Sequence, residues 1–435
     1  MKRYDSYKDS GVKWLGEIPS HWEVKRLRAA LSERKERFNS AESLMILSLI
    51  KDKGIIPYDE KGEVGNKSKD DHTQYKVARK GDLVINSMNV IIGSLGITPY
   101  DGYISPAYYA FKPNNNIFLS YYNYILSLRK VQQSIRCFSK GIMEIRLKIS
   151  AYDFLSMPFP FPTIKEQEAI ANYLDAATSK IDEAIAQQQK MIDLLNERKQ
   201  IIINNAVTKG LDPNVKMKPS GIDWIGDIPE HWKVMKTLFA LSMPITDGPH
   251  ETPQLYDDGI PFVSAEAVSC GNGRIDFDHI RGFISKAYYE ECCKKYIPRR
   301  NDIYMIKSGA TTGKVALVDT DRVFTIWSPL AVFRCNDKVM EFNYLFYLLQ
   351  ADSYQMQVQL SWSYGTQQNI GMRTLEKLKI QVPSLEEQRS IANFLNERIS
   401  KIEVTKQNVN RVISLLQERK QIIINDVVTG KVKVV

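Results

Sequence analysis

Two short patterns in the sequence could support phosphate or metal chemistry. The first is a glycine-rich turn in which Gly309 and Gly313 precede Lys314. A phosphate-binding loop has four residues between these glycines and a Ser or Thr after the lysine, whereas this chain has three residues and a valine. The second pattern is the pair of Glu-x-Lys triplets that begin at Glu197 and Glu418. No obvious acidic metal partner precedes either triplet, so we interpret them as solvated helix charges or subunit contacts.

Residues for other catalytic chemistry are also missing from the sequence. Methyl transfer to an amino group of a base would need an Asn/Asp-Pro-Pro-aromatic tetrapeptide and a glycine-rich cofactor loop, and neither occurs. The five cysteines have no zinc-site spacing, and their odd number argues against a disulfide framework. His21 and His231 each precede a tryptophan in a repeated segment, where packing is the better explanation. We therefore expect no catalytic residue, no metal and no cofactor in this chain.

The size and charge of the chain favour a multi-domain protein with an anionic partner. Its 435 residues, 43% of them hydrophobic, are enough for two or three domains with ordinary cores. The net charge of +9 suits a polyanion. Residues 1–162 carry a net +8 (25 Lys and Arg against 17 Asp and Glu), while residues 211–382 carry a net −1 (19 against 20). No segment has the apolar length of a membrane span or a secretion signal, so we expect a cytoplasmic protein.

The elements that must position any functional side chains are set by an internal repeat. The segment from Gly11 to Trp22 returns as Gly221 to Trp232, at an offset of 210 residues. A second stretch, 162–208, matches 383–429 without a gap at an offset of 221, with 23 identities in 47 positions. The frame of the chain is therefore duplicated, while the blocks inside the frame have diverged.

Each copy of the longer stretch has the heptad pattern of one long helix. Thr163 and Ser384 are candidate N-caps, because Glu166 and Glu387 follow them after three residues. A helix of about 42 residues is roughly 63 Å long, too long to be buried in one domain, so we expect the two helices to pack against each other as a coiled coil. A homodimeric coiled coil for each copy is the alternative. The predicted seam contains Leu174, Ile181, Leu195, Ile202, Leu395, Ile402, Val409, Leu416 and Ile423.

The blocks between these helices are predicted to be two similar mixed α/β domains. The predicted strands cover 81–86, 91–97 and 104–111 in the first block, and 301–306, 314–318 and 326–333 in the second. The predicted fold class is therefore α/β, with two similar domains separated by two long antiparallel coiled-coil helices in a pseudo-two-fold internal repeat. The expected boundaries are 1–161 for the first domain, 162–210 for the central helix, 211–382 for the second domain and 383–435 for the C-terminal helix.

The order of these parts resembles the specificity subunits of type I restriction-modification systems. The similar motifs are the Trp-Leu/Ile-Gly-Glu/Asp-Ile-Pro-x-His-Trp sequence that ends at Trp22 and Trp232, the Pro-x-x-x-Glu-Gln-x-x-Ile-Ala sequence that begins at Pro162 and Pro383, and the Glu-Arg-Lys-Gln sequence of each helix. The resemblance covers nearly the whole chain. It implies two target-recognition domains that each read one half of a bipartite, asymmetric DNA site, with the helices setting the spacer between the halves.

The resemblance also implies partners whose chemistry this chain lacks. Two modification subunits, which hold S-adenosylmethionine and methylate adenine, would bind around the helices, and restriction subunits, which translocate and cut DNA, would join them. S-adenosylmethionine, ATP and Mg²⁺ would belong to those partners. The chain itself is then a non-catalytic subunit that binds double-stranded DNA and has no membrane contact. Two alternatives are a self-contained DNA endonuclease and a coiled-coil scaffold that does not bind DNA.

Candidates for DNA contacts are polar side chains on the loops of both domains. In the major groove, Arg and Lys pair with guanine, and Asn and Gln with adenine, through two-pronged hydrogen bonds. The segment from Gly365 to Asn369 is similar to the family's loop before the helix, whereas the first domain has the different stretch 140–146 in this place. The candidates are Lys67, Lys69, Asn86, Ser87, Asn89 and Arg146 in the first domain, and Lys307, Ser308, Thr311, Gln367, Gln368, Asn369 and Arg373 in the second.

Overall fold

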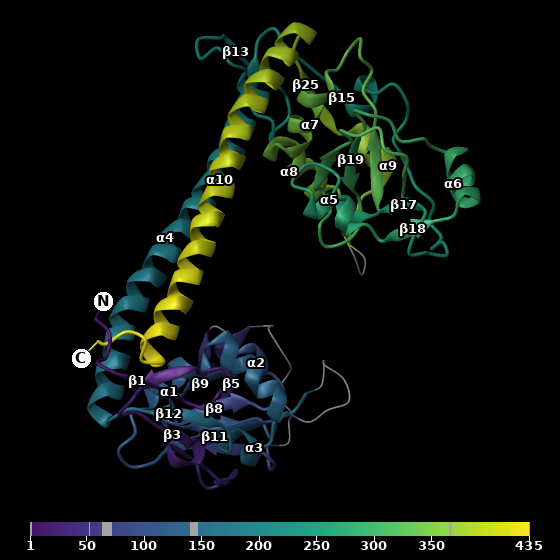
Figure 1. Cartoon of the computed structure of the whole chain (residues 1–435). Coiled ribbons are helices and arrows are strands. Elements are labelled where there is room, and N and C mark those ends of the chain that lie inside the picture. Colours follow the sequence, from purple (N-terminus) through teal and green to yellow (C-terminus); the bar gives the residue numbers. More distant parts are fainter. Residues whose placement is uncertain (1, 52, 63–71, 140–146, 365–367, 435) are drawn as a thin grey trace. The chain divides into compact units, whose positions relative to one another are not determined.

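A computed structural model describes residues 2–51, 53–62, 72–139, 147–364 and 368–434 of the chain. It forms two compact units (Figure 1): unit 1 is Met1–Gln189 together with Asn410–Val435, and unit 2 is Lys190–Val409. Two long helices, α4 (Ile164–Lys209) and α10 (Leu385–Val428), each contribute to both units. The predicted fold class is confirmed in its two similar α/β domains and two long helices, while the predicted domain boundaries stay predictions.

Unit 1 is a mixed α/β structure built around two four-stranded sheets. The first sheet has the order β4-β11-β8-β9 and is antiparallel throughout, and the second has the order β6-β5-β10-β7 and contains a parallel pair, β5 with β10. Strands β1 and β2 form one further pair, and β3 and β12 another. The elements that precede α4 are β1 (Tyr7–Asp9), β2 (Glu17–Pro19), β3 (Glu23–Arg26), η1 (Leu27–Ala29), β4 (Leu31–Glu33), β5 (Met45–Ile50), β6 (Gly54–Pro57), η2 (Tyr58–Lys61), β7 (Lys76–Ala78), β8 (Leu83–Asn86), η3 (Val90–Ile92), β9 (Leu95–Ile97), β10 (Gly102–Ile104), β11 (Tyr108–Pro113), α1 (Leu119–Leu126), α2 (Arg129–Phe138), α3 (Ala151–Leu155) and β12 (Pro158–Phe161).

Unit 2 repeats this plan. Its central antiparallel sheet has the order β16-β22-β19-β20, and a three-stranded sheet, β18-β17-β21, again contains a parallel pair, β17 with β21. The pairs β13-β14 and β15-β25 correspond to the two pairs of unit 1, and β23-β24 is an additional hairpin. The elements between the long helices are β13 (Met217–Pro219), β14 (Asp227–Pro229), β15 (Lys233–Lys236), η5 (Thr237–Ala240), β16 (Thr246–Asp247), β17 (Ile260–Val263), α5 (Ala265–Cys270), η6 (Phe277–His279), β18 (Gly282–Ile284), α6 (Lys286–Cys293), β19 (Ile303–Ile306), β20 (Val315–Leu317), β21 (Thr325–Ile326), β22 (Leu330–Phe333), α7 (Phe342–Gln350), α8 (Asp352–Leu360), β23 (Ser363–Tyr364), β24 (Gln368–Asn369), α9 (Met372–Lys377) and β25 (Lys379–Val382).

The central strands β8 and β19 begin at the same kind of turn. The carboxylates of Asp82 and Asp302 each accept a hydrogen bond, 2.8 Å long in both units, from the backbone N–H three residues earlier. The preceding residues, Gly81 and Asn301, have φ angles of +89° and +71°, a left-handed conformation that glycine and asparagine tolerate better than other residues. This turn fixes where each central strand begins. It therefore also fixes the position of the far end of the strand, which leads into the loop with the candidate residues.

The structure corrects three predictions about strands. Residues 104–111 and 326–333 were each expected to form one strand, but each stretch is divided between two sheets. Pro106 and Pro329 lie at the divisions, and proline has no N–H to donate to a sheet ladder. Residues 91–97, also expected to be one strand, are divided between η3 and β9. The backbone carbonyl groups at the two proline-containing breaks accept hydrogen bonds from the loops that carry candidate residues.

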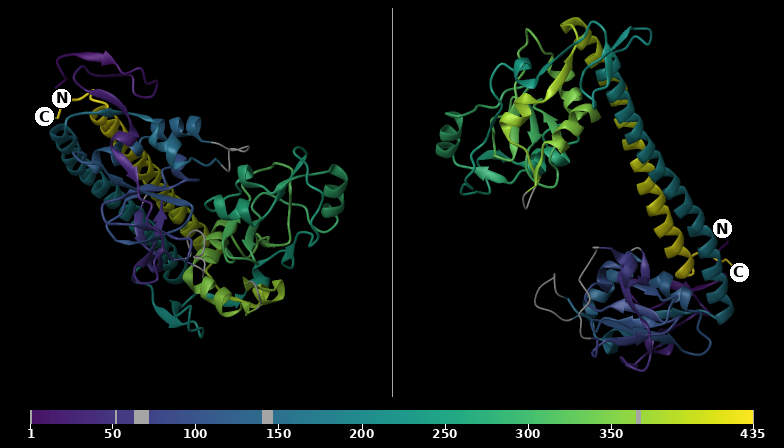
Figure 2. Two further views of the ribbon diagram at one scale, coloured as in Figure 1. Left: turned by 90° about the horizontal axis from the view of Figure 1, so that it is seen from below. Right: turned by 180° about the vertical axis from the view of Figure 1, so that it is seen from behind.

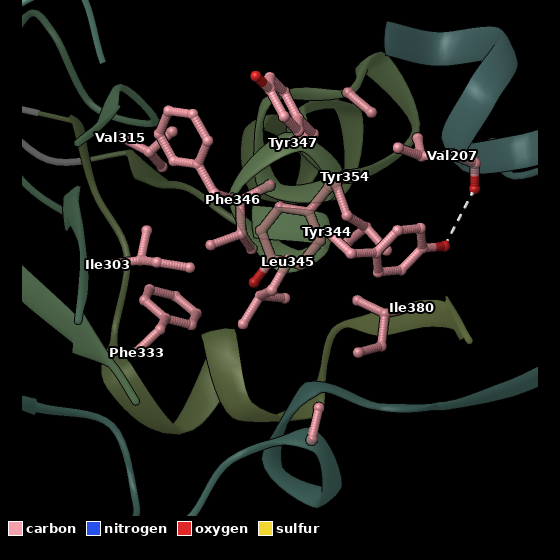
Figure 3. Packing of buried hydrophobic residues seen from close by; sticks show 14 of the residues in the cluster. Val207, Ile303, Val315, Phe333, Tyr344, Leu345, Phe346, Tyr347, Tyr354 and Ile380 are labelled. Carbon is pink, nitrogen blue, oxygen red and sulfur yellow. Dashed lines mark hydrogen bonds between the residues drawn. The ribbon is translucent and has the colours of Figure 1, made fainter. Parts of the chain in front are cut away.

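The core of unit 2 lies between its central sheet and α7, and it includes the end of α4. Figure 3 shows the α7 side chains packed against Ile303 of β19 and Phe333 of β22, with Tyr344 turned toward Val207 of α4. The Tyr344 hydroxyl lies within hydrogen-bond distance of two carbonyl oxygens, those of Gln381 at 3.1 Å and Val207 at 3.4 Å. Burial raises the pKa of Tyr344 well above its ordinary value, so this hydroxyl keeps its proton and donates. The end of the long helix is thus part of a domain core.

Candidate nucleic-acid interface

The repeated His-Trp and Glu-Gln motifs meet where each long helix begins. In unit 1, Glu166 Oε1 lies 2.8 Å from His21 Nε2 and accepts a hydrogen bond from Trp22 Nε1 at 3.1 Å. Glu166 Oε2 accepts from the N–H and the hydroxyl of Thr163, at 3.0 and 2.8 Å, which completes a capping box. Burial raises the pKa of Glu166, but the hydrogen bonds from these three residues outweigh burial and hold the pKa below its ordinary value.

Unit 2 has the same junction at the start of α10. Glu387 lies 2.9 Å from His231 Nε2 and accepts a hydrogen bond from Trp232 Nε1 at 3.0 Å. The hydroxyl of Ser384 accepts from the N–H of Glu387 at 3.3 Å, as expected for an N-cap. In both units, therefore, the segment that leads into the domain is fixed to the cap of a long helix.

The end of the other long helix lies beside each junction. In unit 1, Gly430 follows α10 with a φ of +75°, and a Cβ there would lie 3.1 Å from the ring of Trp22. In unit 2, Gly210 follows α4 with the same φ, and a Cβ there would lie 3.4 Å from Trp232. Lys2 pairs with Lys433, so both termini of the chain lie in unit 1 (Figure 2). Each unit therefore holds the start of one long helix and the end of the other, which makes the two helices antiparallel.

The helices pack together between these junctions. In unit 1, Lys420 Nζ lies 2.7 Å from a carboxylate oxygen of Asp182, and in unit 2, Lys199 Nζ lies 2.8 Å from one of Glu403. Most of the predicted seam is buried, and the rest is partly buried. The buried members are Leu174, Ile181, Leu395, Ile402 and Val409, and the partly buried ones are Leu195, Ile202, Leu416 and Ile423. Which of these side chains face each other across the seam stays a prediction.

In unit 2 the structure brings together candidates from two separate loops. Ser308 forms an antiparallel bridge with Asn369, and the carbonyl group of Lys307 accepts a backbone hydrogen bond at 2.9 Å from the residue that follows Asn369. Gln368 and Asn369 are exposed and Ser308 is partly exposed, whereas Lys307 is only 9% exposed. These loops place polar side chains on one surface beyond the end of β19.

The corresponding loop of unit 1 has the same backbone contacts and different side chains. Ser87 occupies the position of Lys307, since each donates its N–H to the proline-containing break, at 3.2 Å to Ala107 and 2.7 Å to Pro329. Ser87 is 1% exposed, and its hydroxyl has no hydrogen-bond partner within the described ranges of the chain. The two domains therefore present different chemistry at equivalent positions.

The other described candidates lie close to these loops in sequence but differ in exposure. Asn86 is buried, and its Oδ1 accepts a hydrogen bond from the N–H of Met88 at 3.1 Å. Asn89 is exposed beside η3, Thr311 is partly buried in the turn after β19, and Arg373 is exposed on α9. Lys67, Lys69, Arg146 and Gln367 fall outside the described residues. The contact of any candidate with a base stays a prediction.

A cluster of positive side chains lies beside the loop of unit 1. Lys76 Nζ donates to the carbonyl oxygen of Tyr108 at 2.6 Å, at the start of the strand that pairs with the end of β8. Lys76 also pairs through its backbone with Arg37. Burial lowers the pKa of Lys76, and the charges of Lys148 and Arg37 lower it further, while Glu33 acts in the opposite direction. Positive charge is therefore concentrated at this end of the sheet, as a polyanion site requires.

Unit 2 also has basic groups at this end of its central sheet, gathered around Asp247 at the end of β16. They are Lys295, Lys307 and His250. Sequence reasoning selected Lys307 and missed the other two, as it missed Lys76 and Lys148 in unit 1. No spacing in the sequence could have identified them, because strands from distant parts of the chain bring these residues together.

Within the described ranges, no group of three or more His, Cys, Asp or Glu side chains is placed to hold a metal ion. Over the same residues, no helix combines the length and apolar character needed to cross a membrane.

The fold and these surfaces define a class of protein in which two similar α/β domains, each with a basic loop region, are carried by a pair of long helices. The family described as "Type I restriction modification DNA specificity domain" matches residues 19–192 and 251–414. The chain therefore belongs to this family, and its role is recognition rather than catalysis.

Three relatives illustrate the similarity. The putative type I restriction enzyme MjaX specificity subunit of Methanocaldococcus jannaschii is 25% identical, over 98% of each chain. The type I restriction enzyme MjaVIII specificity subunit of the same organism is 24% identical over 72% of this chain and 70% of its own. A solved structure, described as the structural basis of complex assembly and conformational transition of the type I R-M system, has a TM-score of 0.68 at 17% identity, over 95% of this chain and 99% of the other. The solved structure supports the fold.

Proposed function

We propose that this chain reads a bipartite, asymmetric double-stranded DNA site, one half through each domain, and that the long helices set the spacer between the halves. Equivalent loops with different side chains carry this proposal. Unit 1 exposes Asn89 in the loop after its central strand, whereas unit 2 exposes Gln368 and Asn369 beside its own, so the two loop regions offer different side chains to solvent. Because base edges are recognised by side-chain donors and acceptors, two such surfaces select different half-sites.

Genome-wide methylation mapping of a host that carries this chain tests the proposal. We expect a split motif with two unlike halves. Replacing residues 236–380 by the corresponding block of a relative is expected to change the bases of one half and to leave the other half and the gap unchanged. A continuous or palindromic motif, or a change in both halves after the exchange, would contradict independent recognition by the two domains.

The same proposal gives the long helices a partner. Each helix exposes apolar side chains at repeated positions: Met191, Leu194 and Ile201 on α4, and Val412, Leu415 and Ile422 on α10, all between 42% and 55% exposed. These residues lie at the offset of 221 that relates the two copies. Two equivalent apolar stripes provide two equivalent docking sites, which fits two modification subunits, with restriction subunits joining the complex they form.

Charging both stripes is expected to weaken assembly with the modification subunits. Leu194→Glu and Leu415→Glu each remove a leucine contact and place a charge in the interface, at a cost of about 2 kcal/mol, or about thirtyfold in affinity, per site. Asn196→Glu and Gln417→Glu introduce the same charges two positions further along each helix and are expected to leave assembly unchanged. Co-purification and titration of the subunits would measure both pairs, and equal assembly by the leucine variants would exclude the stripes as docking sites.

The chemistry of the complex then belongs to the partners. In this proposal S-adenosylmethionine serves the modification subunits, and ATP and Mg²⁺ serve the restriction subunits. This chain supplies no cofactor site and acts in the cytoplasm, where the DNA is accessible.

A further inference from the structure

The basic groups of unit 2 are organised by one buried carboxylate. Asp247 has no exposed surface. Its Oδ1 contacts Lys295 Nζ, while its Oδ2 lies 3.3 Å from Lys307 Nζ and 3.2 Å from His250 Nε2. Lys295 Nζ also donates to the carbonyl oxygen of Gly248 at 3.3 Å. Three basic side chains from separate segments therefore converge on the same acid.

The cluster has more positive than negative charge. Two ammonium groups contact the one carboxylate of Asp247, so a positive charge is left over even when His250 is neutral. The carboxylate lies behind its partners, since Lys295 and His250 have side chains that are 48% and 71% exposed. An anion that approaches from solvent therefore meets the basic groups and not Asp247.

The backbone holds this cluster in place. A Cβ on Gly248 would lie 2.0 Å from the carbonyl oxygen of Ile326, so the loop after β16 lies directly against the end of β21. The N–H of Ser328 donates to the carbonyl oxygen of Pro249 at 3.1 Å. Basic groups that are already fixed lose little conformational freedom when they bind, which favours a defined anion site over a diffuse positive surface.

The place of the cluster in the fold points to the ligand. Lys307 belongs to the loop that corresponds to Ser87 of unit 1, and the Lys76 cluster lies beside Ser87. Both units therefore gather positive charge at the same end of the central sheet, although unit 2 as a whole has little net charge to attract a polyanion. A local basic site therefore offsets the low net charge of unit 2.

We propose that Lys295, Lys307 and His250, positioned by Asp247, form a binding site for one phosphate group of the DNA backbone. This inference rests on the proposed function and adds a specific role within it. Lys307 is mostly buried and held by Asp247, so it contributes to the phosphate site and does not read a base. Base recognition in unit 2 then belongs to the exposed side chains of the paired loop, Gln368 and Asn369.

The test uses the full-length chain and a random-sequence DNA duplex over a series of salt concentrations. Each neutralised phosphate contributes about 0.9 to the slope of log affinity against log salt. We expect Lys295→Gln to reduce the slope by about that amount, and Lys295→Arg to retain the wild-type slope. Lys294→Gln is the matched control, because Lys294 is adjacent, exposed and paired with Glu291; its slope is expected to stay close to that of the wild type.

Methylation mapping in the host completes the test. With Lys295→Gln and with Lys307→Met, the recognised bases are expected to stay the same while methylation becomes less complete. A wild-type slope in Lys295→Gln, or an altered base in either variant, would overturn the phosphate site. Failure of the wild-type chain to bind DNA at any salt concentration would overturn the proposed function as well, so the two failures are distinguishable.

Discussion

Replacing Glu166 by alanine is expected to destabilise unit 1 by about 3 kcal/mol, whereas the same replacement at Glu168 is expected to have little effect. The Glu166 carboxylate caps α4 and also accepts the hydrogen bond of Trp22 Nε1. Trp22 is fully buried, so its N–H would lose an acceptor that water cannot replace. Glu168 is exposed two residues further along the same helix and is therefore a matched control.

Hydrogen exchange measured by mass spectrometry would locate the effect. Peptides from residues 2–35 and from the first turns of α4 are expected to lose protection in Glu166→Ala, while the equivalent peptides of unit 2 keep theirs. Glu387→Ala should give the reverse pattern, with exposed Glu386 as its control. Equal protection in both units after either replacement would show that the carboxylate does not hold the junction.

The stabilisation by Glu166 is expected to depend on pH. Hydrogen bonds hold its pKa below the ordinary value of 4.5 in the folded protein. Between these two pKa values the unfolded chain binds more protons than the folded one, so stability falls as the pH falls through that range. The contribution of Glu166 to stability is fully present above pH 4.5. The stability difference between the wild type and Glu166→Gln, measured by denaturation, should therefore decrease below that pH.

The internal repeat made the architecture predictable from the sequence alone. Sequence identity between the two long stretches predicted equal helices, and the heptads predicted that these helices need each other to bury their apolar side. Both inferences depend on local periodicity, which the sequence displays directly. The Thr163 capping box was predictable for the same reason, because its donor and acceptor are three residues apart. The contact of His21 and Trp22 with Glu166 was not, since 145 and 144 residues separate the partners.

A related physical reason explains why the basic clusters could not be predicted from the sequence. Lys307 meets Asp247 only because β16 pairs with β22, and β22 with β19. The sequence does not specify that order of strands. Lys307 was selected for its position on a loop, but a loop position does not reveal that the ammonium group is buried against a carboxylate. Chemical type and loop position together are therefore insufficient to distinguish a base contact from a phosphate contact.

Adding seven residues to both long helices, after Gln189 and after Val409, is expected to lengthen the gap between the recognised half-sites without changing their bases. Seven residues extend a helix by about 10.5 Å and keep the heptad register. B-DNA rises about 3.4 Å per base pair, so the added length matches about three base pairs, which also turn the second half-site by roughly 100°. Because length and rotation conflict, we expect a gap longer by about one to three base pairs, as determined by methylation mapping.

The same insertion in α4 alone should act differently, because the helices are antiparallel and paired in both units. Lys199 contacts Glu403 in unit 2, and Lys420 contacts Asp182 in unit 1. Lengthening only α4 leaves α10 too short to keep both contacts in register, so one of the two packed regions must separate. We therefore expect the single insertion to weaken assembly and reduce methylation rather than select a longer gap. If the matched insertions kept the original gap at full activity, the helices would not set the spacing; if the single insertion were as active as the matched pair, the helices would not act as one paired element.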